Sequence, residues 1–293
     1  MATIQGTLAD DLLDGTEGDD VILARAGNDT VHGRGGNDVI GLDSGNDIAF
    51  GEAGDDTIMG GDGNDQLDGG EGDDSLSGGA GDDRLVGGAG NDRLQGHGGD
   101  DDLRGGLGDD HMVGGDGDDY LDGGGGANIL FGGAGNDTIA VYSRDQVTAG
   151  DGDDLIEIGG YDSLDARISL GRGADSFTMD YSGGNQEFAG GGRTIITDFR
   201  HGEDQIGALR FVITDDDGTE TIGFEALDSN ADGVVGVGDA GVSLEDGGLT
   251  IDLAPALTEL ASVGRPGFEV TNPMILRLLG VTELTSADFG AEV

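Results

Sequence analysis

Apolar residues recur at every ninth position through the first half of the chain. Counted in nines from Gly6, the sequence gives 15 uninterrupted units that end at Ala140, and position 8 of every unit is apolar, from Leu13 to Ile139. Nine residues are too few for a helical hairpin, and the pattern lacks the 3.6-residue spacing of an amphipathic helix. A strict internal period is typical of a solenoid, in which each unit stacks on its neighbours. The pattern therefore predicts a repeat architecture.

Each nine-residue unit divides into a turn and a strand. Position 4 is Gly in 14 units, position 5 is Asp or Asn in 14, and position 6 is Asp in 14. Glycine permits a positive φ, and Asn and Asp tolerate the left-handed region better than most residues. We therefore expect the first six positions to turn and the last three to form a minimal strand with its middle side chain inward. Stacking predicts an all-β fold, a parallel β-roll with two short sheets, in which units n and n+2 lie on the same side.

Composition argues against an ordinary hydrophobic core. The 293 residues include 64 glycines, no Trp and no Cys, and the formal net charge is −48. Few large apolar residues combined with high net charge normally indicate disorder, so something cationic must hold this chain together. The charge should repel DNA, RNA and anionic lipid headgroups, so we expect no nucleic-acid partner. The N-terminus shows no signal peptide, and no run approaches the ~18 apolar residues of a membrane span.

Position 6 supplies the candidate metal ligands. Carboxylate and carbonyl oxygens converging from two stacked turns would make the all-oxygen shell that Ca²⁺ prefers, whereas Mg²⁺ demands strict octahedral geometry and zinc favours His or thiolate. One ion between units n and n+2 allows up to 13 sites, and 13 divalent ions would nearly neutralise the net charge of −27 on residues 6–140. The predicted ligands are Asp11, Asp20, Asp29, Asp38, Asp47, Asp56, Asp65, Asp74, Asp83, Asp92, Asp101, Asp110, Asp119 and Asp137.

Several units resemble a known repeat. "GGDGNDQLD", "GGAGDDRLV" and "GGDGDDYLD" are similar to the GGxGxDxUx nonapeptide of RTX (repeats-in-toxin) proteins, a calcium-binding parallel β-helix repeat. The resemblance covers Gly6–Ala140 and is strongest from Gly60 on, where most units also have Gly at position 2. The units that start at Ala24 and Leu42 depart from it at position 1. The resemblance implies a hemolysin-type, secreted calcium-binding protein.

Degenerate repeats follow the 15 units. "AGDGDDLIE" restarts the period at Ala149, and "LGRGADSFT" begins at Leu170, which adds Asp154 and Asp175 to the candidate ligands. We therefore place an RTX-like β-roll at residues 1–158 and, at residues 159–293, degenerate repeats with a β-rich capping region, an EF-hand-like loop and a C-terminal secretion signal.

The segment Arg193–Leu209 resembles the I-x-D-F-x-x-G-x-D-x-I segment that caps the roll in many RTX proteins. A cap is needed because an open sheet edge invites aggregation. Asp198 and Asp204 in this segment are either further ligands or exposed loop acids. A small ligand site formed by His201 or by residues 180–217 is a further alternative.

A second calcium motif is "DSNADGVVGVGD". It places Asp228, Asn230 and Asp232 at positions 1, 3 and 5 of a loop that resembles an EF-hand, with Gly233 at position 6 and Asp239 at position 12. It departs from the EF-hand at position 12, where Asp replaces the bidentate Glu. The loop either binds one further calcium ion or is an ordinary acidic turn.

The C-terminal segment is similar to RTX C-termini, which carry an uncleaved signal for a type I (ABC-transporter) exporter. Extracellular calcium modules bind in the range of about 10⁻⁴–10⁻³ M, so we expect a chain that is unfolded in the cytosol and folds outside the cell. A final pair of strands that closes the domain is compatible with this role, because a signal that is read while the chain is unfolded can fold later.

The sequence offers no recognisable catalytic constellation. The four histidines are scattered without an HExxH motif, Cys is absent, and acidic pairs occur everywhere, so we expect no enzyme. Two functions remain open. One is a calcium-dependent binding, surface or matrix scaffold that contacts polysaccharide or cell surfaces, and the other is a small secreted effector that acts on host membranes, by forming pores or in nodulation signalling.

Overall fold

The computed structural model of the chain describes residues 1–142, 144–159, 165–180, 183–184, 192–200, 203–215, 218–222, 234–236, 242–245, 248–252, 274–279, 281, 283–285 and 288. It has two compact units, Met1–Ile139 and Ala140–Val293. The predicted all-β fold with parallel sheets is confirmed in both of them.

The first unit is built almost wholly of short strands and tight turns. Its strands are β1 (Thr3–Gln5), β2 (Leu12–Asp14), β3 (Val21–Leu23), β4 (Thr30–Gly35), β5 (Val39–Ser44), β6 (Ile48–Ala53), β7 (Thr57–Asp62), β8 (Gln66–Glu71), β9 (Ser75–Ala80), β10 (Arg84–Ala89), β11 (Arg93–Gly98), β12 (Asp102–Leu107), β13 (His111–Asp116), β14 (Tyr120–Gly125), β15 (Ile129–Ala134) and β16 (Thr138–Val141), the last of which begins just before the unit's end.

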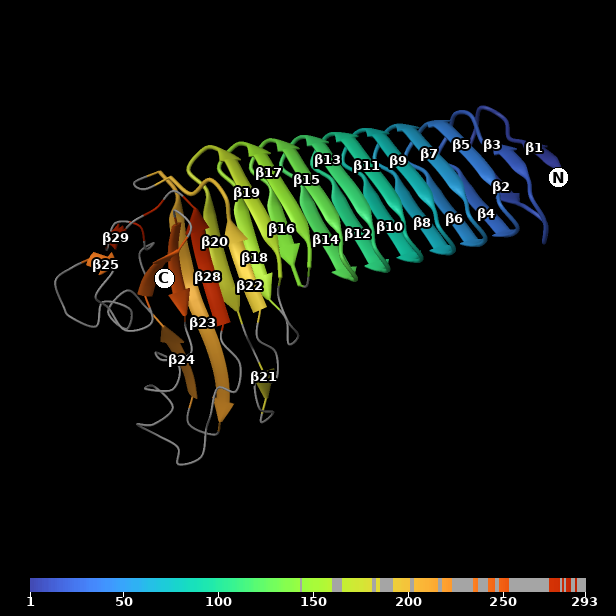
Figure 1. Cartoon of the computed structure of the whole chain (residues 1–293). Helices are drawn as coiled ribbons and strands as arrows, with labels where there is room; N and C mark the ends of the chain where they lie inside the picture. The colour runs from blue at the N-terminus through green and yellow to red at the C-terminus, as the bar shows by residue number, and fades with distance from the viewer. Residues whose placement is uncertain are drawn as a thin grey trace. The chain divides into compact units, whose positions relative to one another are not determined.

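The strands of the first unit alternate between two parallel sheets (Figure 1). The odd-numbered strands β1 to β15 follow one another in one sheet, and the even-numbered strands from β2 to β14 do so in the other. Leu67 pairs with Leu85, and Leu85 pairs with Leu103 on the following strand of the same sheet. Two nonapeptides therefore make one turn of the roll, as the sequence predicts.

From β4 to β15 each strand has six residues, so the prediction of three-residue strands is wrong there. The strand continues from positions 7–9 of one unit into positions 1–3 of the next, and Gly88 pairs with Gly70 and Ala89 with Glu71 beyond the apolar residue. This continuation requires a positive φ at position 2. Gly70 adopts 106° there and Gly88 adopts 114°, which glycine does without a Cβ penalty.

Three positions of each unit face the interior of the roll. The apolar residues at position 8 are at most 2% exposed from Ile22 to Ile139, and Leu13 is half-buried. The residue at position 1 and the carboxylate at position 6 are buried beside them. In most units the apolar centre is thus a single side chain wide, between a glycine at position 1 and a carboxylate at position 6; Ala24 and Leu42 each add a second buried apolar side chain. Such a thin core has little apolar area to set against the entropy of ordering a glycine-rich chain.

The second unit begins with parallel strands and ends with antiparallel ones. Its strands are β17 (Gln146–Asp151), β18 (Leu155–Gly159), β19 (Arg167–Arg172), β20 (Ser176–Asp180), β21 (Gly183–Gly184), β22 (Gly192–Ile196), β23 (Gln205–Asp215), β24 (Gly218–Ile222), β25 (Val234–Gly236), β26 (Val242–Glu245), β27 (Gly248–Asp252), β28 (Met274–Leu279) and β29 (Glu283–Thr285).

One sheet of the second unit runs in the order β17, β19, β22, β28, β27 and β26, and the other runs β18, β20, β23 and β21, with β24 on β23. The pairing is parallel up to β28 and antiparallel for β28 with β27, β27 with β26, and β23 with β24. Phe177, at the apolar repeat position, is fully buried, and its ring meets Phe199 edge-on at 6.2 Å between ring centroids. Larger side chains and longer strands thus replace the thin repeat core here.

Candidate metal centre

Each buried carboxylate at position 6 is bound to the main chain of the unit two repeats earlier. From Asp20 to Asp137 the position-6 side chains are at most 3% exposed. The N–H of Asp65 donates to Oδ1 of Asp83 at 2.7 Å, and the same bond, eighteen residues apart, joins successive position-6 residues along the roll. One oxygen of each carboxylate is therefore committed to a ladder of hydrogen bonds that runs along the stacking direction.

A second ladder lies beside the first and runs the opposite way. At position 5 the side chain accepts the N–H of the residue two units later: Asp82 N–H donates to Oδ1 of Asn64 at 3.1 Å, and Asp100 N–H donates to Oδ1 of Asp82 at 3.0 Å. These side chains are exposed, and they need only one acceptor oxygen, which Asn supplies as well as Asp. The pattern of Asp or Asn at position 5 fits this acceptor role, which the sequence alone explained only by tolerance of left-handed backbone.

The second oxygen of the position-6 carboxylate is what distinguishes the two ladders. A buried Oδ2 atom without a hydrogen-bond donor costs free energy unless something positive meets it. In the described chain this atom is buried and accepts no hydrogen bond in Asp29, Asp38, Asp47, Asp56, Asp65, Asp74, Asp83, Asp92, Asp101, Asp119 and Asp175.

Main-chain oxygens converge on the place that this Oδ2 faces. At Gly60 an added Cβ would fall under 3.0 Å both from Oδ2 of Asp65 and from the carbonyl oxygen of Gly78, two units later. Gly51 stands in the same relation to Asp56 and Gly69. Glycine at position 1 therefore leaves a gap lined by carboxylate and carbonyl oxygens from two stacked units. These are the ligand types that Ca²⁺ takes, and the residues fit that ion.

The arrangement differs from the usual acidic cluster. Within the described ranges no three His, Cys, Asp or Glu side chains lie close enough together to hold a metal ion. A position-6 site is instead lined by one carboxylate and by main-chain carbonyl oxygens, including one from two units later. The site therefore depends on the stacking of units rather than on a local cluster of acidic side chains.

Two units depart from this geometry at position 1. Ala24 and Leu42 stand where other units have glycine, and both are fully buried. Because a Cβ at this position would fall under 3.0 Å from Oδ2 in the glycine units, there is less room beside Asp29 and Asp47. We expect weaker metal binding there than in the later units.

Asn128 departs at position 6 itself. Its Oδ1 accepts the N–H of Asp110 at 2.9 Å, which continues the ladder and fixes the orientation of the amide. Its Nδ2 consequently occupies the place of Oδ2, facing the point where a Cβ on Gly123 would lie. An NH₂ group is a donor and carries no negative charge, so this unit lacks the charged ligand of the others.

Comparison with known protein families agrees with this geometry. The RTX calcium-binding nonapeptide repeat matches the chain four times, at residues 5–40, 43–76, 77–112 and 104–139. Residues 5–139 are RTX calcium-binding repeats. No curated protein matches the chain.

Burial and mutual repulsion make the RTX carboxylates reluctant to ionise without a metal. Burial raises the pKa of Asp74, Asp83 and Asp119 to about 7, and neighbouring position-6 carboxylates add to the rise, although the main-chain N–H bond to each group opposes it. Burial likewise raises the pKa to about 6 for Asp38, Asp47, Asp101, Asp137 and Asp175. The pKa of Asp20 is instead lowered by the N–H of Ala2 and, after it, by the donors of Thr16, despite the opposing effect of burial.

The second unit continues the position-6 ladder. Asp154 N–H donates to Oδ1 of Asp175 at 3.0 Å, and Asp175 N–H donates to Oδ1 of Asp204 at 3.3 Å. Oδ2 of Asp204 accepts the N–H of Arg200. Asp204 is therefore a further rung, in the structural position of a repeat Asp, and both its oxygens accept main-chain hydrogen bonds.

Asp198 is a structural residue in the described structure. It accepts the N–H groups of Leu170 and Gly171 at 2.8 and 3.1 Å, and the hydroxyl of Ser169 at 2.9 Å. It thereby ties the segment after β22 to β19. This third possibility, a carboxylate that satisfies main-chain donors, was not among the two that the sequence suggested.

Some predicted residues lie outside the described part of the chain. These are the EF-hand-like residues Asp228, Asn230, Asp232 and Asp239, together with His201. Calcium binding by the EF-hand-like loop stays a prediction.

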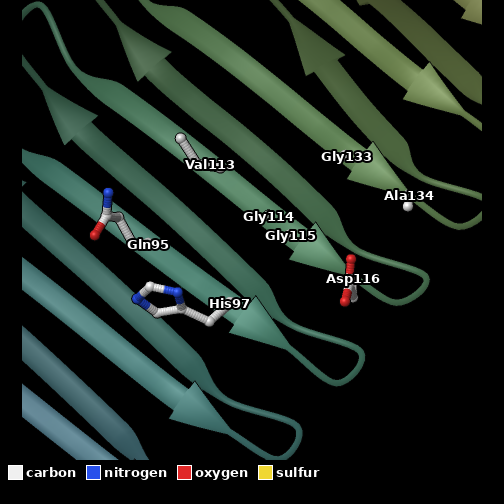
Figure 2. A pocket seen from close by; sticks show the side chains of 8 residues that line it. All are labelled: Gln95, His97, Val113, Gly114, Gly115, Asp116, Gly133 and Ala134. Carbon is white, nitrogen blue, oxygen red and sulfur yellow. The ribbon is translucent and has the colours of Figure 1, made fainter.

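A shallow depression of about 350 Å³ lies on the outer surface of β11, β13 and β15 (Figure 2). The side chains of Gln95, His97 and Asp116 border it, and glycines on the neighbouring strands leave it open. His97 Nε2 lies 3.0 Å from the hydroxyl of Ser77 on β9. The depression includes none of the position-6 carboxylates. It offers a contact surface on the outer face of the roll.

Asp83→Asn and Asp82→Asn form a matched pair that tests the position-6 site. Asp83→Asn keeps the Oδ1 acceptor but places NH₂ in the oxygen-lined gap, as Asn128 does, so the folded protein should lose about one calcium ion. Asp82→Asn keeps the exposed ladder and should leave the calcium count unchanged. Native mass spectrometry at saturating calcium measures both. Equal counts in the two variants would exclude a special role for position 6.

Protons and calcium should compete for the same carboxylate oxygen. The folded pKa of about 7 for Asp74, Asp83 and Asp119 lies above the ordinary Asp value of about 3.9. The metal-free roll therefore binds protons more tightly than the unfolded chain. Protonation stabilises it fully below a pH of about 4, and this stabilisation is lost as the pH rises through about 7.

We therefore expect apparent calcium affinity to fall as the pH is lowered from about 7.5 to about 5.5, and calcium binding to release protons in this range. Calorimetry in two buffers of different ionisation enthalpy measures the released protons. A proton release of zero at a pH of about 6 would contradict the assignment.

Proposed function

We propose that this protein is a secreted calcium-binding RTX protein that folds when it meets calcium outside the cell and then acts as a non-enzymatic binding, surface or matrix scaffold. The column of buried carboxylate oxygens that accept no hydrogen bond in the described roll is the observation that carries this proposal. Family membership supports calcium binding, and the scaffold role rests on the arguments below.

Folding should be coupled to calcium because the roll has little else to stabilise it. The interior holds one apolar side chain in most units, while like charges stack along the same axis. An ion that binds only the folded form adds stability by mass action, by about 2.7 kcal/mol for each site at a hundredfold excess over its Kd. Several such sites would outweigh the repulsion and the backbone entropy, whereas low cytosolic calcium would leave the chain unfolded.

A repetitive exposed surface suits a binding or matrix role. The two sheets present outward rows at positions 7 and 9 in which polar side chains alternate with exposed apolar ones such as Met59 and Phe131. The depression beside His97 is one place where a partner such as a polysaccharide or a cell surface could bind. The imidazoles of His32 on β4 and His97 on β11 lie on the outer faces of the two different sheets, against Glu52 and Ser77 respectively. In the described part of the chain no helix is long and apolar enough to span a membrane.

Circular dichroism of the full chain tests calcium-driven folding. In excess EGTA at neutral pH we expect a disordered spectrum, and strand signal should appear cooperatively as free calcium rises to about 10⁻⁴–10⁻³ M. Magnesium at the same concentration is the matched control and should produce little signal. A folded roll in excess EGTA would overturn the proposal.

Export is tested separately by truncation. RTX proteins are typically secreted, and the tail of this chain is similar to segments that type I exporters read. Removal of the residues from about Gly241 onward should retain the protein in the cell, and the same segment should export a slow-folding passenger through a type I system. Secretion of the truncated chain would show that the signal lies elsewhere. Retention accompanied by loss of calcium-dependent folding would contradict a dedicated export role for the tail.

A further inference from the structure

Threonine occupies position 2 in the first two nonapeptides, where most later units have glycine. Thr7 donates both its N–H, at 2.6 Å, and its hydroxyl, at 2.9 Å, to Oδ2 of Asp11. Thr16 donates to Oδ2 of Asp20 in the same way, at 2.7 and 2.8 Å. The oxygen that accepts no hydrogen bond in Asp29 and in most later units is therefore held here by two protein donors.

The hydroxyl groups also close the turn on itself. The position-4 N–H groups of Ala9 and Gly18 donate to Oγ1 of Thr7 and Thr16 at 3.2 and 3.4 Å. In later units the position-4 N–H instead donates to a carbonyl two units further on, as Gly54 does to Glu71 at 2.8 Å. Thr7 and Thr16 thus connect position 4 to position 6 across each of the first two turns.

The backbone conformation separates these two turns from the others. Position 2 takes a positive φ even where it is not glycine, between 68° at Asp43 and 89° at Arg25, but Thr7 and Thr16 are not among the described residues with positive φ. A β-branched residue strongly disfavours that region. The N–H of position 2 therefore stays directed at the carboxylate in the first two units.

Asp20 is fully satisfied as a result. Its Oδ1 accepts the N–H of Ala2 at 2.6 Å, and its Oδ2 accepts both donors of Thr16. Hydrogen bonds to an ionised carboxylate are among the stronger ones in proteins, so calcium would have to displace two of them at each turn and also change the backbone. In the second unit Asp204 resembles Asp20, because both of its oxygens accept hydrogen bonds: Oδ1 from the N–H of Asp175 and Oδ2 from the N–H of Arg200.

We propose that the turns of Asp11 and Asp20 bind no calcium, because Thr7 and Thr16 take the place of the ion, so that metal binding in the first unit is confined to the later turns. This inference rests on the calcium-dependent function proposed above. Stacking allows at most 13 ions, and this inference lowers that maximum by two. In the first two turns the carboxylates are held by hydrogen bonds from Thr7 and Thr16 rather than by an ion.

Paired substitutions test the inference on the full chain, with calcium ions counted by native mass spectrometry at saturating calcium. The double variant Asp11→Asn/Asp20→Asn should keep the wild-type count, whereas Asp83→Asn/Asp92→Asn should lose about two ions. A loss of one or two ions from the first double variant would overturn the inference and leave the proposed function intact. Absence of calcium from the wild-type protein would instead overturn the proposed function.

Hydrogen exchange covers the case in which the aspartate variants disturb the first turns. In calcium, Thr7→Val/Thr16→Val should raise the exchange rate of the amides between Thr7 and Asp20 by about tenfold, because the hydroxyl donors are lost, whereas Thr7→Ser/Thr16→Ser should keep the wild-type rate. If calcium held these carboxylates, both double variants would exchange at the wild-type rate, and that result would refute the role of the hydroxyls.

Discussion

The structure of the first unit depends on a column of buried carboxylates that the protein itself only half satisfies. One oxygen of each accepts a main-chain hydrogen bond from two units earlier, and in most units the other faces carbonyl oxygens of a neighbouring turn. Negative atoms that face one another in a buried space repel, and their raised pKa values express the same repulsion. A divalent cation beside these oxygens would remove this conflict and so stabilise the stacking of units n and n+2.

Other features of the roll serve this column. Glycine at position 1 keeps the gap beside the carboxylate open, and a positive φ at position 2 lets the strand continue past it. The single apolar side chain per unit orders the coil without filling the interior. Where a unit departs from the pattern, the departure has a local consequence: Leu42 narrows the gap, Asn128 places a donor in it, and Thr16 closes it.

Sequence reasoning succeeded where a role depends on residue type repeated at a fixed spacing. The period of nine predicted the two parallel sheets and the burial of residues such as Leu67 and Leu85. It fell short where a role depends on which main-chain donors come close. Asp198 and Asp204 look alike in the sequence, yet Asp198 accepts hydrogen bonds from three residues of β19 and Asp204 is the last described rung of the position-6 ladder.

The sequence by itself determined the repeat, the all-β class and the choice of calcium, because a periodic pattern of glycine, carboxylate and apolar residues leaves few alternatives. Only the tertiary structure decided which oxygen of each carboxylate is left for a metal. That choice is made by N–H groups eighteen residues away, such as the N–H of Asp65 on Asp83, and by a hydroxyl four residues away, that of Thr16 on Asp20. Hydrogen-bond partners are set by how the backbone is stacked and turned, which residue types alone do not specify.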